Sequence, residues 1–326
     1  MNWLASTIGK RGYVADYLRT ASGVGARVIG TGNETNTIGF MACDAAYRVS
    51  AISAPEYVNE VHEICISEQI NAIVTFSDID VRVLSRHKER FVEAGIACFF
   101  PDSITAEMFG DKWRSYEAFI DAGFETPQSW LTIESVDHSF SDGPLVVKPR
   151  DGSASQGYSV VEDRQQLENA FNAIDRPLIQ TFTAGRLVNV EVCSSVAGVP
   201  LAATAWERLS SIAGETALAR TIEHPAAIQY VLDLLAKTPV PGPIDVDIID
   251  VDGRLYILEI NTRFGGGYPV SHLAGADFPG KMIRSLNEPL RSPTSSIDDY
   301  QRGVTMMKAL TPVVFSNERV VRAKHN

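Results

Sequence analysis

The segment LEINTRFGGG places a carboxylate, a carboxamide and a guanidinium at every second position and ends in three glycines. Successive side chains of a strand point to opposite faces, so Glu259, Asn261 and Arg263 share one face. Asp245 and Asp247 show the same spacing in the preceding segment DVDIIDVDG. Oxygen ligands from two strands suit Mg²⁺ held by one or two carboxylates together with phosphate oxygens. The alternative is a polar sheet face that carries cross-strand charge pairs.

Whether these acids meet depends on the register of the hairpin that joins the two strands. A two-residue turn at the dipeptide DG would pair Asp247 with Leu258 and would put Glu259 on the opposite face. A three-residue connection, DGR, would pair Asp247 with Glu259 and Asp245 with Asn261. We favour the second register, because the first would scatter acids over both faces of a strand pair that is otherwise apolar enough to be buried.

A glycine-rich loop after an apolar strand is the second chemical feature, in PLVVKPRDGSASQGYSVV. Lys148 ends the strand, and the loop from Gly152 to Gly157, with Ser153 and Ser155, offers backbone amides that could cover a polyphosphate. The segment is not a P-loop, because its lysine precedes the loop and no G-x-x-x-x-G-K-[ST] motif occurs. Its simpler interpretation is a mobile hairpin.

The elements that must position these residues begin with an α/β region. The first hundred residues alternate apolar runs such as GARVIGT, NAIVTFS and IACFF with helical stretches such as APEYVNEVHEICISEQI. Strands separated by helices of this length predict βαβ units and a parallel sheet. Two helical stretches, the strands PLVVKPR, RPLIQTF and LVNVEVCSSVAGVPL, the amphipathic helix PAAIQYVLDLLAKT and the acidic hairpin follow. The pattern predicts an open α/β domain followed by α+β structure.

Composition narrows the classes of function. The chain has 326 residues and a formal net charge of -11, and it contains no basic run, which argues against a nucleic-acid partner. Its four cysteines are far apart and form no C-x-x-C pair. We therefore expect neither a zinc site nor a disulfide framework, and a reducing cytoplasm fits best. No run of about 18 uncharged apolar residues occurs, so we expect neither a membrane span nor a signal peptide.

Together these segments resemble the ATP-grasp superfamily, in particular the branch similar to the carbamoyl-phosphate synthase large subunit. GDKWRSYEAFIDAGFETPQSW resembles the first helices of that fold, LVVKPRDGSASQG its phosphate-loop strand, LIQTFTAG its adenine hinge and EINTRFGGG its metal-binding E-x-N-x-R. The resemblance implies an α/β (α+β) chain with a preATP-grasp open parallel sheet domain at 1–105. An ATP-grasp fold of two α+β subdomains would follow, a small lid subdomain at 106–183 and a large subdomain with the metal site at 184–326.

The resemblance also implies roles for individual residues. Lys112 and Lys148 would contact the phosphates of ATP, and Arg263 together with Lys148 would stabilise the γ-phosphate in transit and the acyl phosphate that forms. Further nucleotide contacts would come from the loop residues Gly152, Ser153, Ser155 and Gly157 and from the hinge residues Gln180, Thr181 and Phe182. Two Mg²⁺ ions, with Mn²⁺ as an alternative, would be held by Asp247 and Glu259 and by Glu259 and Asn261.

Substrate contacts are expected from two further segments. WERLSSIAGETALARTIEHP looks loop-like, and in related ATP-grasp enzymes this region faces the acceptor. Arg208 and Arg220 could bind a substrate carboxylate bidentately, with Glu215 between them, or the segment is a solvated surface loop. Gly266 in the glycine run permits close backbone approach to a ligand. His272 could position substrate, although a histidine beside apolar neighbours is more often structural.

The sequence therefore predicts a Mg²⁺-dependent ATP-grasp ligase that activates a small-molecule carboxylate as an acyl phosphate and couples it to an amine, with release of ADP and phosphate. Its partners would be these two small molecules, without nucleic acid or membrane, and a homodimer is left open. Leu187 departs from the family, which often has a ribose-binding glutamate there. Two alternatives stay open: a catalytically silent ATP-binding sensor or assembly subunit, which Leu187 favours, and an ATP-grasp phosphotransferase. The motifs name neither the carboxylate, nor the amine, nor the pathway.

Overall fold

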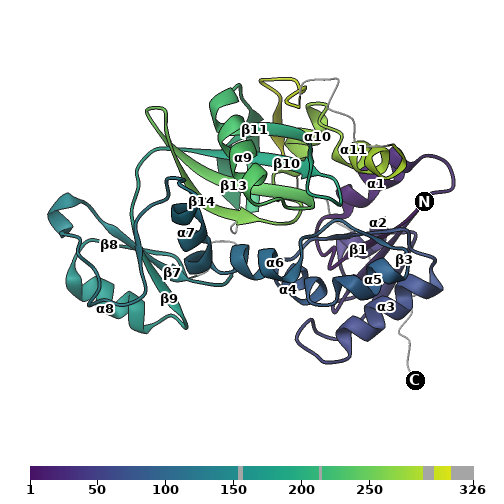
Figure 1. Cartoon of the computed structure of the whole chain (residues 1–326), viewed down its shortest axis with the longest axis horizontal. Helices are drawn as coiled ribbons and strands as arrows, with labels where there is room; N and C mark the ends of the chain where they lie inside the picture. The colour runs from purple at the N-terminus through teal and green to yellow at the C-terminus, as the bar shows by residue number, and fades with distance from the viewer. Residues whose placement is uncertain (153–156, 213–214, 289–296, 310–326) are drawn as a thin grey trace.

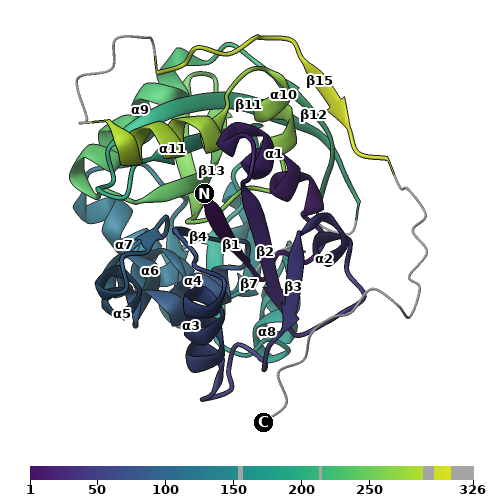
Figure 2. The same ribbon diagram turned by 90° about the vertical axis from the view of Figure 1, so that its right-hand side faces the viewer.

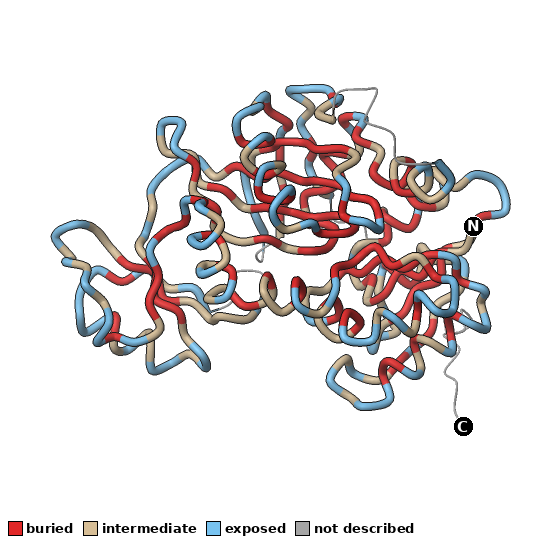
Figure 3. The backbone as a smooth tube through the Cα atoms, viewed as in Figure 1, coloured by how far each residue is buried: buried red, intermediate tan, exposed pale blue. Residues whose placement is uncertain are grey.

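The computed structural model describes residues 1–152, 157–212, 215–288 and 297–309, which form three sheets. Figure 1 shows the N-terminal sheet and a small sheet toward opposite ends of the long axis, with the large sheet between them. The strands of all three sheets are mostly buried, and exposed residues are concentrated in the outer helices and turns (Figure 3). None of the helices in these ranges combines the length and the apolarity that crossing a bilayer requires.

The N-terminal sheet has five parallel strands in the order β3-β2-β1-β4-β5. The strands are β1 (Asn2–Ser6), β2 (Arg27–Gly32), β3 (Ala45–Arg48), β4 (Ala72–Thr75) and β5 (Ala97–Cys98). The helices are α1 (Gly12–Ser22), α2 (Ile38–Ala42), α3 (Tyr57–Ser67), α4 (Asp78–Ser85) and α5 (Lys88–Glu93). The expected open α/β domain is confirmed, and it gains β1 and α1, which precede the first strand identified in the sequence.

The strand order of this sheet reverses between β1 and β4, the point at which open α/β sheets bind ligands beyond the carboxyl ends of their strands. The chain leaves β1 toward Arg11 and leaves β4 toward Asp78. The topology thus brings these two charged residues to the same edge. That edge faces the large sheet, because the guanidinium of Arg11 donates to the carbonyl of Phe264, which follows the large sheet's last long strand.

Two helices, α6 (Ser103–Phe109) and α7 (Lys112–Asp121), connect the N-terminal sheet to the small sheet. Asp111 caps α7 by accepting hydrogen bonds from the backbone N–H groups of Trp113 and Arg114. The same carboxylate pairs with Arg150 at 2.7 Å and with Arg176 at 2.8 Å, both from the small-sheet region. Lys112, the first residue of α7, is therefore held at the junction.

The small sheet is antiparallel, with the order β6-β9-β7-β8. Its elements are β6 (Ser129–Trp130), the 3-10 helix Phe140–Asp142, β7 (Leu145–Pro149), β8 (Ser159–Val161), α8 (Arg164–Asn172) and β9 (Pro177–Thr181). Leu167 of α8 packs into the sheet's own core with Leu145, Val147 and Ile179. The small sheet therefore has a hydrophobic core separate from that of the large sheet.

The large sheet has six antiparallel strands in the order β14-β13-β10-β11-β12-β15. Its strands are β10 (Arg186–Ser194), β11 (Pro200–Ile212), β12 (Glu215–Thr221), β13 (Gly242–Val251), β14 (Arg254–Asn261) and β15 (Thr305–Met307). The helices are α9 (Pro225–Lys237), α10 (Tyr268–Leu273) and α11 (Phe278–Asn287). With the parallel sheet before them, these antiparallel sheets confirm the expected fold class.

Candidate active site

A β-bulge sets the register of the acidic hairpin. Val251 pairs with Arg254, so the turn contains two residues, both with positive φ, 52° and 92°. This is a correction, because we expected a three-residue connection. Ile248 pairs with Ile257 but Asp247 pairs with Glu259, which leaves Leu258 as the extra residue of the bulge. The pairing of Asp247 with Glu259 is thus confirmed, and the bulge produces it rather than the turn.

The bulge places the carboxyl groups of Asp247 and Glu259 side by side, within hydrogen-bond distance of each other. Burial, together with the neighbouring charges of Asp245 and Glu259, raises the pKa of Asp247 to about 8. Burial alone would raise the pKa of Glu259, but the ammonium groups of Lys112 and Lys148 bring it below its ordinary value. The pair therefore shares one proton near neutral pH.

This arrangement fits a divalent cation. Two facing carboxylates that must share a proton form a site where a cation can replace that proton, and both offer hard oxygen ligands. The amide oxygen of Asn189 lies buried beside them without a hydrogen-bond partner in the described part of the chain. In that part, no group of three or more His, Cys, Asp or Glu side chains is arranged to hold a metal ion by itself. The protein alone would hold Mg²⁺ incompletely, which leaves coordination positions for phosphate oxygens.

Asn261, the third expected metal ligand, is already engaged. Its side-chain oxygen accepts a hydrogen bond from Arg263 at 3.0 Å, and its amide nitrogen lies 3.5 Å from the carbonyl oxygen of Asp245. Asn189 of β10, which the sequence analysis did not identify, donates to both Asp245 and Asp247. Its place on the acidic face was visible as the alternation of Asn189 and Glu191 in LVNVEV.

Lys112 and Lys148 converge on this pair from two other elements. The ammonium group of Lys112 lies 3.4 Å from Glu259 and donates to the carbonyl of Gly152 at 3.0 Å. The ammonium group of Lys148 donates to the side-chain oxygen of Gln180 at 2.8 Å. Burial lowers the pKa of Lys148 to about 8, and Lys112 contributes to this shift. The two lysines, the hinge and the acidic pair form one site between the small and large sheets.

The glycine loop is described only at its ends. Gly152 and Gly157 have positive φ values of 118° and 71°, which favour glycine. Ser153 and Ser155 lie outside the described residues. In the hinge, the N–H groups of Thr181 and Phe182 donate to the carbonyls of Gln128 and Pro144. The nucleotide contacts assigned to these residues stay predictions.

Arg263 and Arg208 flank the acidic face from opposite directions. The guanidinium of Arg263 is 3.2 Å from Asp78 of α4 and 3.9 Å from Asp245. The guanidinium of Arg208 lies 3.5 Å from Asp247, and its Nε is buried without a partner among the described residues. Asp78 was not identified from the sequence, because nothing local in SDIDVRV marks a contact with a residue 185 positions later.

The segment WERLSSIAGETALARTIEHP, which we expected to be loop-like, instead contributes to the β11–β12 hairpin, and its residues pair across these two strands. Arg220 lies opposite Glu207 and pairs with it, and Arg186 pairs with the same carboxylate. Since Glu207 and Arg208 are consecutive on one strand, Arg220 and Arg208 point to opposite faces. The structure therefore keeps Arg208 at the acidic face and separates Arg220 from it.

The three glycines after Arg263 differ in their surroundings. A Cβ atom at Gly265 would lie 2.5 Å from a Glu191 oxygen, and one at Gly267 would lie 2.1 Å from the Trp206 ring. A Cβ atom at Gly266 would meet nothing within 4 Å in the described part of the chain. Two of the glycines thus allow tight packing over the acidic face, while Gly266 faces open space.

His272 packs away from the acidic pair. Its ring stacks on Tyr17 of α1 at 3.7 Å between centroids, and its Nδ1 lies 3.1 Å from the hydroxyl of Tyr268. Burial lowers the pKa of His272, so the neutral ring is favoured. These contacts join α10 to α1, and they agree with a structural role for His272 rather than a role in positioning substrate.

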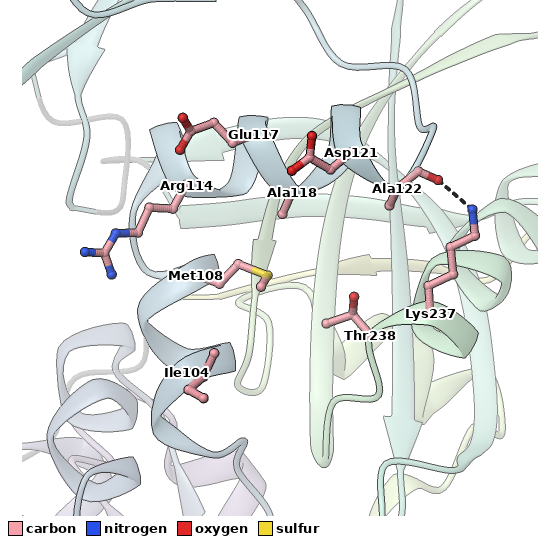
Figure 4. Close-up of a pocket in the computed structure, with 9 residues that line it drawn as sticks. All are labelled: Ile104, Met108, Arg114, Glu117, Ala118, Asp121, Ala122, Lys237 and Thr238. Atoms are coloured by element: carbon pink, nitrogen blue, oxygen red, sulfur yellow. Dashed lines mark hydrogen bonds between the residues drawn. The ribbon is translucent and has the colours of Figure 1, made fainter.

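A cleft of about 580 Å³ opens elsewhere, between α6, α7 and the end of α9 (Figure 4). It is lined by Ile104, Met108, Arg114, Glu117, Ala118, Asp121, Ala122, Lys237 and Thr238. None of these residues belongs to the acidic face or the lysine pair, so the cleft is separate from the candidate site.

Comparison with known proteins identifies both parts of the chain. Residues 109–267 match the family model of the ATP-grasp domain, and residues 4–99 match that of the PylC-like N-terminal domain. The expected resemblance to the ATP-grasp superfamily is therefore confirmed.

Three curated relatives are similar at low identity. The D-alanine–D-alanine ligase of Fusobacterium nucleatum is 22% identical over 48% of this chain and 56% of its own length. The 3-methyl-D-ornithine–L-lysine ligase of Methanosarcina mazei is 25% identical over 54% and 45%, and the carbamoyl-phosphate synthase of Methanobrevibacter smithii is 21% identical over 65% and 62%. The chain thus spans about half the length of the first two relatives.

A solved structure agrees with the fold. The biotin carboxylase domain of the 2-oxoglutarate carboxylase of Hydrogenobacter thermophilus, in complex with MgADP and bicarbonate, has a TM-score of 0.70 and 18% identity. The match covers 92% of this chain and 72% of that domain. At this identity the similarity establishes a common fold.

Proposed function

The chain joins a PylC-like N-terminal domain to an ATP-grasp domain, and from this premise we propose that it is an ATP-dependent ligase. It activates a small-molecule carboxylate as an acyl phosphate and couples it to an amine, releasing ADP and phosphate. The observation that carries the proposal is the convergence of Lys112 from α7, Lys148 from β7 and the Asp247–Glu259 pair from the β13–β14 hairpin. Cations and facing carboxylates at one junction suit a triphosphate with its metal.

In this proposal, the residues of the junction have different roles toward ATP. Lys112 and Lys148 bind phosphate oxygens, and Arg263 stabilises the charge on the phosphoryl group as it moves to the carboxylate oxygen. Asp247 and Glu259 hold Mg²⁺, which when bound neutralises charge on the transferring phosphate. The fold supplies position and charge, and no side-chain nucleophile is required.

The proposal names the two substrates only by chemical class, a carboxylate and an amine. Two relatives are named ligases, one for D-alanine with D-alanine and one for 3-methyl-D-ornithine with L-lysine. These names support C–N bond formation as the reaction type for this chain. Arg208, at the acidic face beside Asp247, supports a carboxylate substrate near the metal site.

The test is ADP release by the purified protein with Mg·ATP, pools of small carboxylates and amino acids, and hydroxylamine as a general nucleophile. Release that depends on one pool and yields a hydroxamate is the expected result. Binding of Mg·ATP without release in any pool would contradict the ligase and favour the sensor. A phosphorylated hydroxyl compound as product would favour the phosphotransferase.

A further inference from the structure

A second polar cluster lies beyond Arg263, where the start of α1 approaches the outer strands of the large sheet. Its members are Arg11, Tyr13, Glu215 and Lys308, none of which handles ATP in the proposal above. They come from three distant segments: the beginning of α1, the first residue of β12 and the residue after β15. Figure 2 shows α1 on the side of the molecule along which β12 and β15 run.

Arg11 is a fixed guanidinium on which the charges of Glu215 and Asp78 act, but it has no ion-pair partner among the described residues. One of its terminal nitrogens donates to the carbonyls of Phe76 and Phe264, both at 2.9 Å. These two bonds hold it between the N-terminal domain and the loop that follows β14. Within the described ranges no carboxylate forms an ion pair with it, and burial together with Arg263 lowers its pKa. A positioned cation of this kind is a site for an anion.

Tyr13 adds a hydrogen-bond donor beside this cation. Its hydroxyl is buried and has no hydrogen-bond partner in the described part of the chain. Buried polar groups normally have a partner, so an orphaned hydroxyl points to a ligand that supplies one. Burial raises the pKa of Tyr13 to about 12, which keeps the hydroxyl protonated and able to donate.

Glu215 and Lys308 complete the cluster with one charge of each sign. The ammonium group of Lys308 lies 3.5 Å from the Glu215 carboxylate and 5.6 Å from the centre of the Tyr13 ring. The side chains of the pair are partly exposed, Lys308 to 24% and Glu215 to 42%. An ion pair of this exposure contributes little to stability, so it can open for a ligand at low cost.

Glu191 connects this cluster to the acidic face. One of its oxygens accepts from Ser271, and the other is buried without a partner among the described residues. It lies opposite Asp245 across β10 and β13, and it is near enough to Tyr13 and Lys308 to affect their pKa values. Arg11 and Arg263 also share an acceptor, because both donate to the carbonyl of Phe264. The cluster is therefore continuous with the site at which phosphoryl transfer is proposed.

We propose that this cluster binds an amino acid as its zwitterion, with the carboxylate on Arg11 and the Tyr13 hydroxyl and the ammonium group on Glu215. A ligand with both charges gives Glu215 and Lys308 each a new partner of opposite charge when their ion pair opens, because Lys308 can turn to the carboxylate. A simple carboxylate that drew Lys308 away would leave Glu215 without a partner, and a simple amine would leave Arg11 without one. The inference rests on the proposed function, since the amino acid would be one of the two ligase substrates.

The test compares three variants in the ADP-release assay. Glu215→Gln removes the ammonium partner, and Tyr13→Phe removes only a hydroxyl. Glu207→Gln is the matched control, because Glu207 pairs with Arg186 and Arg220 on the opposite face of the same hairpin. We expect release, measured without hydroxylamine, to require an α-amino acid. We also expect the KM for that amino acid to rise about tenfold or more in the first two variants, with the KM for ATP unchanged and the control like the parent.

The outcomes separate this inference from the function on which it rests. Release sustained by carboxylates and amines that each lack the other group overturns the zwitterion site and leaves the ligase standing. Unchanged KM values for the amino acid in folded Glu215→Gln and Tyr13→Phe do the same. Absence of ADP release by the parent protein in every pool overturns both. Thermal unfolding of each variant shows whether it is folded, and Tyr13→Phe, which keeps the ring, serves if Glu215→Gln does not fold.

Discussion

The guanidinium of Arg263 is ion-paired with the carboxylate of Asp78 across the boundary between the N-terminal domain and the large sheet. Nε and a terminal nitrogen of Arg263 both donate to one Asp78 oxygen, at 3.2 Å each. The Arg263 side chain is only 9% exposed, whereas that of Asp78 is 28% exposed, so the guanidinium is the shielded member of the pair. The N-terminal domain therefore orients a group that we assign to phosphoryl transfer, which gives Asp78 the role of a positioning residue.

Asp78→Asn removes the charge that orients Arg263. We expect kcat to fall about 10- to 100-fold, because the guanidinium loses its fixed direction, while the KM for ATP changes little. Steady-state kinetics against ATP measures both values, and Asp78→Glu should restore part of the rate. An unchanged kcat in a folded Asp78→Asn protein would remove Asp78 from the mechanism.

Glu259→Gln replaces the carboxylate that we assign to metal binding with a nearly isosteric amide. We expect turnover to fall by several orders of magnitude with the fold intact, because the metal loses one anionic ligand. Glu207→Gln is again the control, since it removes a carboxylate from the other face of the same sheet. Near-normal turnover in Glu259→Gln would contradict the metal assignment.

Lys148→Met keeps much of the length of the side chain and removes its charge. We expect the dissociation constant for ADP to rise about 10- to 100-fold, because the variant cannot form a buried charge-assisted hydrogen bond to phosphate. Calorimetry with MgADP measures it. Lys88→Met is a matched control, because the Lys88 ammonium group bonds only the carbonyl of Phe100 in the N-terminal domain among the described contacts. Equal affinities in parent and Lys148→Met would place the phosphates elsewhere.

The raised pKa of Asp247 makes the stability of the metal-free protein depend on pH. Between the ordinary carboxyl pKa and about 8, the folded protein keeps a proton on Asp247 that the unfolded chain releases. The free energy of unfolding should therefore decrease as the pH rises through this window. Mg²⁺ should counteract the decrease because it replaces the proton.

Thermal unfolding in EDTA and in excess Mg²⁺ from pH 5 to about pH 9 tests this linkage. Asp247→Asn should make the pH dependence in EDTA less steep, because one group with a raised pKa is gone, while the buried carboxyls of Glu191 and Asp245 still titrate. The same slope in Asp247→Asn and in the parent protein would show that another group is responsible.

The local sequence pattern was sufficient to predict that the two acids pair, but not to predict the β-bulge and the domain contacts around them. Alternation in DVDIIDVDG and LEINTRFGGG predicted that Asp247 would face Glu259. The route to this register was wrong, because no residue type marks Leu258 as a bulge and the dipeptide DG does form the two-residue turn. A bulge depends on the fit of the whole sheet, which the sequence of one hairpin does not contain.

The contacts between domains had no local signal at all. Arg11 and Asp78 follow strands at the point where the sheet order reverses, so their meeting with Phe264 and Arg263 depends on topology and domain docking. Arg220 shows the converse, because its residue type suggested a substrate contact while strand alternation turned it to the opposite face. The spacing of residue types along the chain thus predicted the fold class and the acidic hairpin. The positions of the other site residues depend on contacts between the domains.

The most direct test of the ligase follows oxygen from the carboxylate substrate. With both carboxylate oxygens of the active pool labelled as ¹⁸O, an acyl-phosphate route transfers one labelled oxygen to each phosphate released, because the new bond joins that oxygen to phosphorus. We predict this label in the ³¹P spectrum of the product phosphate, in step with ADP release. Phosphate without label, formed at the same rate as ADP, would contradict activation of a carboxylate and with it the proposed function.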